Sequence, residues 1–267
     1  MNEEVCIGVF DSGLGGLSVL RAIRARLPQA HLLYVADSGH APYGERPPAY
    51  VQTRSLAIAA FLRSQRADLM VVACNTATAA ASALLRERYP AWQIVGVEPG
   101  LKPAATATRN GRIGVLATEG TLGSEKFKLL AQAHAAHLQL FLQPCPGLAA
   151  AIEHGDADAP AVREHVQQCC APLLAQRVDT VVLGCTHYPF VAHHIQAAMG
   201  PQVTLIDTAD AVARRTEALS PEASATDALP GTTRLWTTGH LPTLQDVARH
   251  WLPFTCETAL LTLPAND

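Results

Sequence analysis

Short apolar runs alternate with longer amphipathic segments along most of the chain. The runs are rich in Val, Leu and Ala, are bounded by Gly, Pro or Asp, and have the length of buried strands. They predict strands at residues 6–10, 31–36, 69–73, 93–97, 112–116, 137–142, 179–183 and 202–206. The segments between them have the period of helices, as at residues 17–27, 49–66, 76–89 and 162–176. This alternation predicts an α/β fold with parallel sheets.

An internal repeat divides this pattern into two halves. The stretch DLMVVACNT from Asp68 lines up with DTVVLGCTH from Asp179, an offset of 111 residues between Cys74 and Cys185 (185 − 74). Two shorter matches keep the same order: residues 7–10 with 113–116 (113 − 7 = 106), and residues 94–98 with 203–207 (203 − 94 = 109). We therefore expect two pseudo-symmetric parallel-sheet α/β domains, with the active site in the cleft between them.

Composition narrows the classes of function. Apolar residues make up 49% of the 267 residues and charged residues only 16%, which allows a sizeable core and excludes wholesale disorder. The net charge of −3 gives no broad basic surface, so neither nucleic acid nor an anionic membrane is expected as a partner. No apolar stretch approaches the ~20 residues of a membrane span.

The cysteines indicate a reducing compartment. There are seven, widely spaced, in a chain whose N-terminus is acidic and has no basic, cleavable leader. This favours free thiols in a cytoplasmic enzyme over a disulfide framework. No C-x-x-C pair is present, so a structural zinc site is not expected. The polar residues 220–231 predict a loop before a short C-terminal tail.

Polar residues cluster where the predicted strands end, which is where open α/β sheets bind ligands. That edge collects residues 11–13, 37–44, 74–76, 118–121 and 185–187. Cys74 and Cys185 are each followed by hydroxyl or amide groups in a loop that leads into a helix. A helix N-terminus offers free N–H groups and positive potential, which lower the pKa of a nearby thiol and hold a carboxylate ligand.

Two thiols that face one another suit the inversion of a carbon stereocentre. One group removes the α-proton from one face while the other delivers a proton to the opposite face, and the reverse reaction exchanges the roles. A disulfide reductase also uses two thiols, but needs them within bonding distance. A single buried cysteine at a strand end is most often structural. Two cysteines at matching positions, each followed by similar polar residues, favour a catalytic role.

Five short motifs follow one another along the chain. They are DSGLGG at residues 11–16, ADSGHAPYG at 36–44, CNTAT at 74–78, TEGTLGS at 118–124 and GCTHYP at 184–189. In this order they resemble the glutamate racemases, cofactor-independent enzymes of the aspartate/glutamate racemase superfamily. Thr78, Arg46 and Phe127 stand where the family often has Ser, Lys and Tyr, and these mild departures do not touch the thiols.

The resemblance implies interconversion of L- and D-glutamate, without a cofactor, to supply D-glutamate for peptidoglycan. It implies that Cys74 and Cys185 are the acid/base thiols. Asp11 would assist Cys74 and His187 would assist Cys185, with Glu153 as a further helper near Cys185. The substrate contacts carried over by motif are Asp11, Ser12, Tyr43, Gly44, Asn75, Thr76, Thr118, Thr121, Thr186 and His187.

The resemblance also implies a layout and partners. Residues 1–97 with 208–267 would form the first domain, and residues 98–207 an inserted second one. Homodimers are usual in the family. Some relatives inhibit DNA gyrase, a contact that this sequence leaves open and does not support. The short N-terminus lacks the extension of relatives that a cell-wall precursor activates, so activation is not expected.

The sequence gives little reason to expect a bound cofactor. A pyridoxal cofactor needs a lysine, and of the three lysines Lys126 and Lys128 fall on the polar side of a predicted helix. Lys102 is the one candidate left and is a weak one. The run GLGG at residues 13–16 lacks the third glycine of a dinucleotide loop, because Ser18 occupies that position.

Two pairs of neighbouring residues have side chains that could bind a metal. They are His193-His194 and Cys169-Cys170, and each pair lies in a predicted helix. Adjacent helical residues point ~100° apart, so surface and core positions are expected and no metal site.

Two other functions stay open. Aspartate or hydantoin racemisation, a sister activity of the superfamily, would use the same thiols, and the PYG and TEGT motifs favour glutamate by resemblance alone. A non-catalytic amino-acid-binding or regulatory protein would keep the two-domain cleft. Retention of both Cys74 and Cys185 speaks against it.

Overall fold

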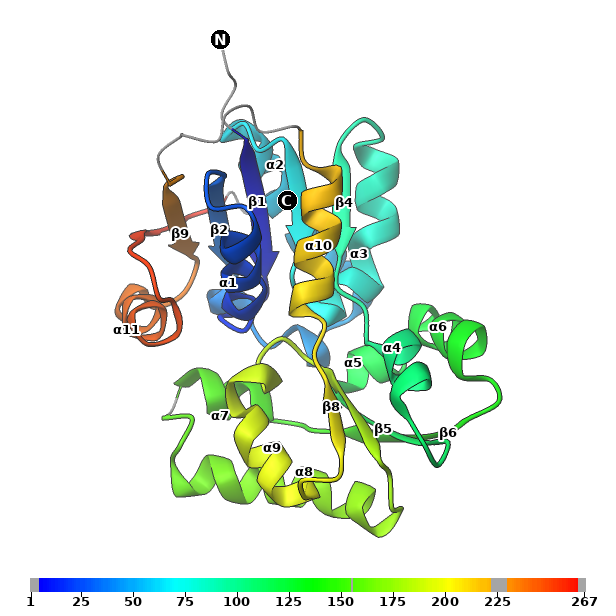
Figure 1. Cartoon of the computed structure of the whole chain (residues 1–267). Helices are drawn as coiled ribbons and strands as arrows, with labels where there is room; N and C mark the ends of the chain where they lie inside the picture. Colours follow the sequence, from blue (N-terminus) through cyan, green and yellow to red (C-terminus); the bar gives the residue numbers. More distant parts are fainter. Residues whose placement is uncertain (1–4, 155, 222–229, 264–267) are drawn as a thin grey trace. The chain divides into compact units, whose positions relative to one another are not determined.

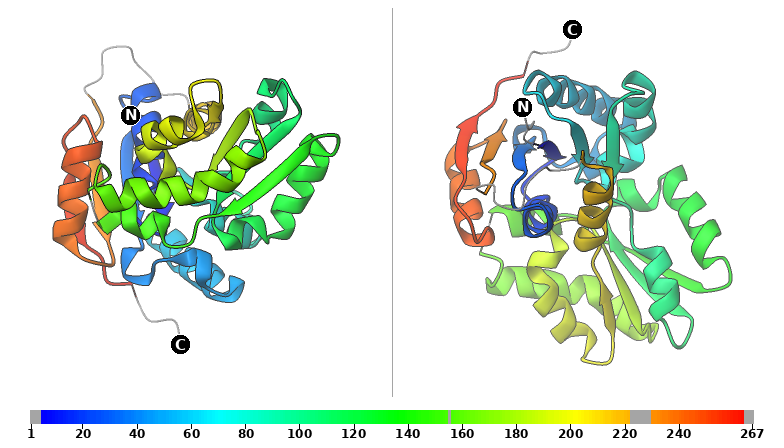
Figure 2. Two further views of the ribbon diagram at one scale, coloured as in Figure 1. Left: turned by 90° about the horizontal axis from the view of Figure 1, so that it is seen from below. Right: turned by 45° about the horizontal axis from the view of Figure 1, so that its top comes forward.

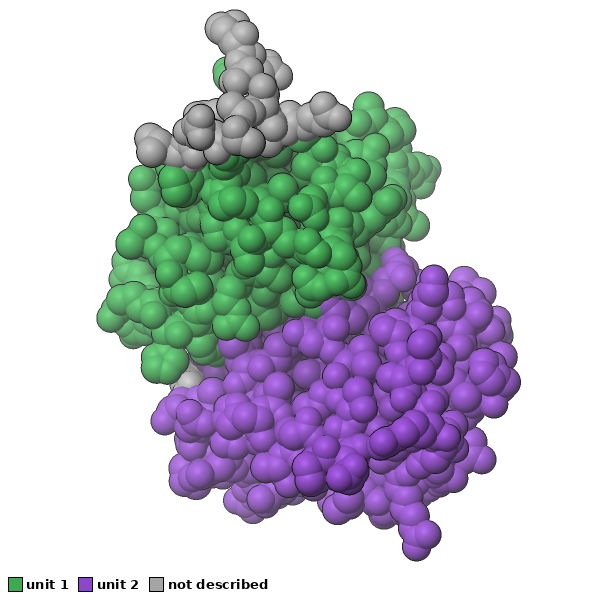
Figure 3. Space-filling model, in the orientation of Figure 1, with its two compact units in different colours: residues 1–97, 209–267 green, residues 98–208 purple. Residues whose placement is uncertain are grey.

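The computed structural model describes residues 5–154, 156–221 and 230–263. The chain forms two compact units, unit 1 with residues 1–97 and 209–267, and unit 2 with residues 98–208 (Figure 3). Of the predicted loop at 220–231, residues 222–229 lie outside the described part, as do the first residues of the acidic N-terminus. No helix in the described part is long and apolar enough to cross a membrane.

Unit 1 is built on a parallel six-stranded sheet in the order β10-β9-β2-β1-β3-β4. In chain order its strands are β1 (Cys6–Asp11), β2 (His31–Ala36), β3 (Leu69–Val72), β4 (Gln93–Gly96), β9 (Thr233–Thr237) and β10 (Glu257–Leu260). Its helices are α1 (Leu17–Arg26), α2 (Pro48–Ser64), α3 (Asn75–Arg88), α10 (Ala209–Leu219) and α11 (Leu241–Trp251), with 3₁₀ turns η1 (Ser38–His40) and η2 (Tyr43–Glu45). Helices α1 and α10 pack together on one face of the sheet, and α2 and α3 on the other (Figures 1 and 2). The core is apolar, with Phe10, Ile58 and Val72 all fully buried.

Unit 2 has a smaller parallel sheet in the order β6-β5-β7-β8. Its strands are β5 (Arg112–Ala117), β6 (Gln139–Pro144), β7 (Thr180–Gly184) and β8 (Thr204–Ile206). Its helices are α4 (Leu101–Ala107), α5 (Glu119–Leu122), α6 (Glu125–Ala135), α7 (Leu148–His154), α8 (Pro160–Ala175) and α9 (Ala192–Met199), with the 3₁₀ turn η3 (Tyr188–Val191). Helix α4 packs with α6, and α8 packs with α9. The predicted α/β class with parallel sheets is confirmed in both units.

The strand registers bear out the internal repeat. Both sheets contain the same four-strand core, β2-β1-β3-β4 in unit 1 and β6-β5-β7-β8 in unit 2. Ile7 pairs with Leu69 as Ile113 pairs with Thr180, which preserves the offsets of 106 (113 − 7) and 111 (180 − 69). Two stretches of chain with different sequences therefore build the same sheet in the same register.

The predicted alignment of the last strand of the repeat is wrong by two residues. Met70 pairs with Ile94, and its counterpart Val181 pairs with Leu205. Ile94 therefore corresponds to Leu205, an offset of 111 (205 − 94), and not to Val203. Short Val- and Ile-rich strands match one another in several registers, and only the hydrogen-bonded partner fixes which one is used.

The C-terminal tail contains structure that the sequence pattern did not predict. Strands β9 and β10 extend the sheet of unit 1 beyond β2, with α11 between them in the chain. Strand β10 is short and mostly exposed, so it lacks the continuous apolar run of a central parallel strand. Strand β6 also begins at Gln139, later than the predicted residue 137, because helix α6 and its following turn extend to that point.

A buried carboxylate ties together the elements around the end of β2. Asp37 is fully buried and accepts hydrogen bonds from Arg54 Nε (2.9 Å), Arg54 Nη2 (2.8 Å), the Tyr43 hydroxyl (2.5 Å) and the Thr238 hydroxyl (2.8 Å). One side chain thus links β2, η2, α2 and the segment after β9. The Arg54 side chain is only 11% exposed, so neither charge is well solvated without the other.

Replacement of Asp37 by Ala is expected to lower the free energy of unfolding by about 3–5 kcal/mol, because the Arg54 charge is left buried without its partner. The control is Arg26→Ala, which breaks surface ion pairs with Asp210 and Glu217 and should cost less than ~1 kcal/mol. Urea unfolding followed by circular dichroism measures both variants. Equal losses in the two would contradict the role given to Asp37.

Candidate active site

In each unit the strand order reverses direction at one point. From β1 the chain goes to β2 on one side and then to β3 on the other, and β5, β6 and β7 repeat this arrangement. Loops diverge at such a switch point, and ligands bind there at the carboxyl ends of the strands. In unit 1, Asp11 is the last residue of β1, Ser12 follows it, and Cys74 follows β3. In unit 2, Thr118 follows β5 and Cys185 follows β7, so each predicted thiol lies at the position where parallel sheets bind ligands.

Cys74 lies immediately before α3 and is 5% exposed. Its Sγ accepts a hydrogen bond from the backbone N–H of Ala77 at 3.4 Å, so it caps the N-terminus of the helix. The hydroxyl of Ser12 lies 3.4 Å from the same sulfur. Both groups can donate to a thiolate, which is the form that removes a proton from carbon.

The helix N-terminus does not dominate the charge state of Cys74. Burial raises the pKa of the thiol, and the negative charge of Asp11 raises it further. The hydrogen bonds from Ser12 and Ala77 lower the pKa by less, so the net value lies well above that of a free cysteine. The expected net lowering at this position is therefore wrong, because desolvation outweighs the helix terminus. Without a bound ligand, Cys74 is held as a thiol.

Asp11 ends β1 with its carboxylate wrapped by the loop that follows. Oδ1 accepts from the backbone N–H of Ser12 (2.7 Å) and from its hydroxyl (3.3 Å), while Oδ2 accepts from the N–H of Gly16 (2.5 Å). A Cβ at residue 16 would lie 2.7 Å from the Asp11 Cβ, so only glycine permits this approach. The last glycine of the GLGG run therefore binds the Asp11 carboxylate, a group of the protein itself.

The other predicted contacts of unit 1 lie beside this centre. Asn75 and Thr76 open helix α3 directly after Cys74. The Asn75 Nδ2 is buried and has no hydrogen-bond partner among the described residues, which leaves it free to donate to a ligand. Tyr43 and Gly44 lie in η2, and the Tyr43 hydroxyl is already engaged by Asp37.

Unit 2 contains a chain of three polar side chains that begins at its thiol. Cys185 Sγ lies 3.7 Å from His187 Nδ1, and His187 Nε2 lies 2.7 Å from Glu153 Oε2. All three residues are buried, with exposures of 8%, 5% and 5%. The arrangement repeats the logic of a thiol with an imidazole partner that is oriented by a carboxylate. Glu153 comes from helix α7, so this contact joins two segments far apart in the chain.

The partners of His187 determine its charge. Burial alone lowers the pKa of the ring, but hydrogen bonds to Cys185 and Glu153 and their negative charges raise it by more. The pKa of His187 therefore lies well above its ordinary value. A protonated His187 donates one N–H to Glu153 and points the other at the sulfur of Cys185. The ring therefore places a positively charged donor beside the Cys185 sulfur.

Predicted threonines surround the same end of unit 2. The Thr118 hydroxyl accepts from the N–H of Thr121 (3.2 Å) and donates to the Thr121 hydroxyl (3.0 Å), so the pair caps the short helix α5. Thr186, 6% exposed, lies between Cys185 and His187. Their assigned roles toward a substrate stay predictions.

The helpers of the two thiols differ although the thiols are equivalent in the repeat. The counterpart of Asp11 is Ala117 (117 − 11 = 106), and the counterpart of His187 is Thr76 (187 − 76 = 111). Cys74 therefore has a carboxylate at the end of the neighbouring strand, whereas Cys185 has an imidazole two residues along its own loop. We call each thiol with its polar neighbours a half-site. The two half-sites occupy equivalent backbone positions, but the charged groups around their thiols differ.

Buried polar residues that the sequence did not single out lie near Cys185. Tyr188 is fully buried, and burial together with the negative charges of Cys185 and Cys145 raises its pKa well above its ordinary value. Cys145 contacts Cys169 through its thiol, and both are buried. Cys170 is 1% exposed as well, so both cysteines of the Cys169-Cys170 pair occupy core positions. Tyr188 lies in the GCTHYP motif, whereas Cys145 carries no sequence signal.

The three lysines lie on α4 and α6 of unit 2. Lys102 is exposed on α4, Lys126 pairs with Glu98 at 2.9 Å, and Lys128 pairs with Glu125 at 3.3 Å.

Known proteins share this sequence and fold. Residues 16–216 match the pattern of the Asp/Glu/Hydantoin racemase family. A glutamate racemase of Pseudomonas aeruginosa (strain UCBPP-PA14) is 53% identical over 236 residues, which cover 88% of this chain and 89% of that protein.

Two solved structures are similar over nearly the whole chain. A glutamate racemase isoform of Bacillus anthracis has a TM-score of 0.88 at 33% identity, covering 100% of both chains. The Escherichia coli glutamate racemase, solved with L-glutamate and the activator UDP-MurNAc-ala, has a TM-score of 0.86 at 32% identity, covering 98% of this chain and 100% of that one. With the family pattern matched over most of its length, the chain belongs to the Asp/Glu/Hydantoin racemase family.

Proposed function

We propose that the chain is a glutamate racemase, an isomerase that interconverts L- and D-glutamate with two cysteine thiols as its acid and base. The observation that carries the proposal is the repeat of one buried thiol at the switch point of each sheet, with a polar partner beside each sulfur. The relatives that are about half identical to this chain are glutamate racemases, and the E. coli relative was solved with L-glutamate.

In the proposed reaction the two thiols act on opposite faces of the same α-carbon. In one direction the Cys185 thiolate removes the α-proton and becomes a thiol, while the Cys74 thiol delivers its proton to the other face and becomes a thiolate. The reverse reaction exchanges the roles. No net proton is gained or lost, so each turnover leaves the enzyme ready for the opposite enantiomer.

The different helpers suit these roles. A protonated His187 next to Cys185 stabilises the thiolate that must wait for substrate. The carboxylate of Asp11 near Cys74 makes the thiolate there less stable, and therefore a stronger base once it has formed. The substrate's own ammonium group adds a positive charge that offsets this cost when the site is occupied.

If no cofactor takes part, as the resemblance implies, the protein itself has to stabilise the intermediate. Deprotonation places negative charge on the substrate's α-carboxylate, and preorganised neutral donors can receive it. The unpartnered Asn75 amide is such a donor, and Thr76 and Thr186 lie next to the thiols. We further propose that the product supplies peptidoglycan synthesis and that the enzyme works as a homodimer.

Two alternatives are not favoured. Aspartate and hydantoin racemases share the superfamily, but the relatives at about half identity over most of the chain are glutamate racemases. A binding protein without turnover has no use for two buried thiols with separate proton partners.

The proposal is tested by polarimetry with the purified chain and no added pyridoxal phosphate. L-glutamate should lose its optical rotation completely, whereas L-aspartate, run in parallel, should keep it. Turnover of aspartate alone would replace the proposed substrate, and turnover of neither would remove the proposed activity.

Cys74→Ser and Cys185→Ser are each expected to reduce racemisation by about 10²- to 10⁴-fold, because a serine hydroxyl is a far weaker acid and a poor proton carrier. Cys256→Ser is the matched control, since this partly exposed thiol lies next to β10 and should leave the rate unchanged. Full activity in either of the first two variants would eliminate the two-thiol mechanism.

Glu153→Gln should lower the pKa of His187 toward its ordinary value of ~6.5, because the variant removes the negative charge at 2.7 Å. Since the folded-state pKa of His187 is raised, its ionic contribution to stability is complete below ~6.5 and disappears as the pH rises through the raised value. The stability difference between wild type and variant should therefore shrink toward alkaline pH.

Nuclear magnetic resonance titration of the His187 ring measures this shift, with His187→Gln to assign the signal. Glu164→Gln, which neutralises an exposed carboxylate on α8, is the control and should leave the titration midpoint in place. An unchanged midpoint in Glu153→Gln would show that Glu153 does not set the charge of His187.

A further inference from the structure

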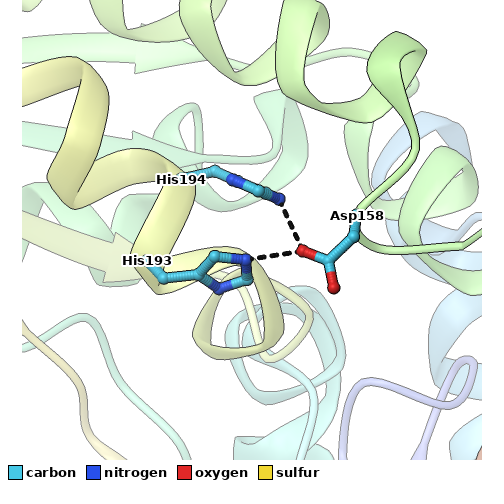
Figure 4. Close-up of side chains that lie close together, drawn as sticks. All are labelled: Asp158, His193 and His194. Atoms are coloured by element: carbon cyan, nitrogen blue, oxygen red, sulfur yellow. Dashed lines mark hydrogen bonds and ion pairs between the residues drawn. The ribbon is translucent and has the colours of Figure 1, made fainter.

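Three side chains of metal-binding type converge in unit 2, on segments separate from the thiols. Asp158 lies in the turn before α8, and His193 and His194 lie in the first turn of α9 (Figure 4). The His193 Nε2 is 2.8 Å and the His194 Nε2 2.9 Å from the same oxygen, Asp158 Oδ1. The three potential ligand atoms all lie within 4.8 Å of one another.

This convergence corrects the expectation that the neighbouring histidines point apart. Their ring centroids are only 3.8 Å apart, and the planes are tilted by 48°. The two side chains do differ in exposure, with 56% of the His193 side chain exposed and 14% of that of His194. Both rings nevertheless reach Asp158, because the carboxylate comes from another segment and meets them from the side (Figure 4). The helical period of one segment carries no information about that contact.

The protein atoms alone leave this cluster incompletely satisfied. Asp158 Oδ1 accepts a hydrogen bond from His193, but His194 Nε2 makes no hydrogen bond of acceptable geometry with any described residue. That nitrogen is also shielded from solvent. A shielded ring nitrogen that lies 2.9 Å from a carboxylate oxygen, and makes no hydrogen bond with it, keeps its lone pair available for another partner, such as a metal ion.

We propose that Asp158, His193 and His194 form a binding site for a divalent transition-metal ion, with zinc the best match. Two imidazoles and a carboxylate are ligands that Zn²⁺, Co²⁺ and Ni²⁺ accept, whereas Mg²⁺ and Ca²⁺ prefer oxygen donors throughout. With metal–ligand bonds of about 2.0–2.1 Å, tetrahedral ligands lie roughly 3.3 Å apart. The two histidine–Asp158 spacings of 2.8 and 2.9 Å need to widen only slightly, and the exposed side chains of Asp158 and His193 have room to do so. A fourth position stays open for water.

The location gives the ion a structural consequence. Asp158 lies five residues after Glu153 (158 − 153), and His193 six residues after His187 (193 − 187). A bound ion would join the turn that follows α7 to the start of α9, and so brace the two segments that carry Glu153 and His187. The metal site itself does not depend on the racemase proposal.

Cobalt titration of the purified full chain tests the site, because Co²⁺ reports its own ligands. We expect one Co²⁺ per chain, visible d–d absorption without thiolate-to-cobalt charge transfer, and displacement by Zn²⁺. Asp158→Asn and His193→Ala should each weaken binding by about tenfold or more, as loss of one of three ligands does. Both side chains are exposed, so circular dichroism should show an unchanged fold.

His137→Ala, which removes an exposed histidine elsewhere in unit 2, is the matched control and should bind like wild type. Zn²⁺ should also raise the melting temperature of wild type and of His137→Ala, and not that of Asp158→Asn. Failure to bind Co²⁺ at micromolar concentration would overturn the proposal. So would binding with a thiolate band that Asp158→Asn leaves unchanged, since the ion would then sit on the cysteines.

Discussion

The ionisation of a buried thiol is the constraint on which the rest of this protein depends. A thiolate that removes a proton from carbon has to be dry, yet burial is what makes the thiolate unfavourable, as the raised pKa of Cys74 shows. Each half-site places its own hydrogen-bond donors beside the sulfur, where they can stabilise a thiolate. Ser12 and the N-terminus of α3 contact the Cys74 sulfur, and the His187–Glu153 pair lies beside Cys185. The surrounding packing keeps these few groups fixed around the sulfur atoms.

The repeated sheet explains how one backbone supplies two such positions. The order β2-β1-β3-β4 and its counterpart β6-β5-β7-β8 create the same switch point twice, and the registers place Cys74 and Cys185 at equivalent places after β3 and β7. The polar groups beside the two thiols differ, with a carboxylate at the end of β1 in one half and an imidazole in the loop after β7 in the other. An acid and a base of unequal strength can thus share one architecture.

Much of this could be predicted from the sequence, because the informative signals are local. The strands of both parallel sheets are short apolar runs, and the thiols and their polar followers lie within the motifs that end them. Contacts between distant segments carry no such signal. Nothing in the helical pattern around Arg54 indicates that it pairs with Asp37, and nothing near Asp158 indicates that His193 and His194 reach it. Likewise the register of β8, and the strands of the C-terminal tail, depend on hydrogen-bonded partners that a single run of residues does not reveal.

The central claim is that two different thiols serve the two faces of one carbon, and isotope tracing tests it most directly. L-glutamate is incubated with the enzyme in D₂O until less than about a tenth of it has been converted. The two enantiomers are then separated, and the deuterium content of each is measured by mass spectrometry. Two separate thiols predict D-glutamate that carries one deuterium, while the recovered L-glutamate stays unlabelled. A single base that serves both faces would return the original proton and give unlabelled D-glutamate. If that base exchanged its proton with solvent first, the recovered L-glutamate would carry deuterium as well. Either result would contradict the account.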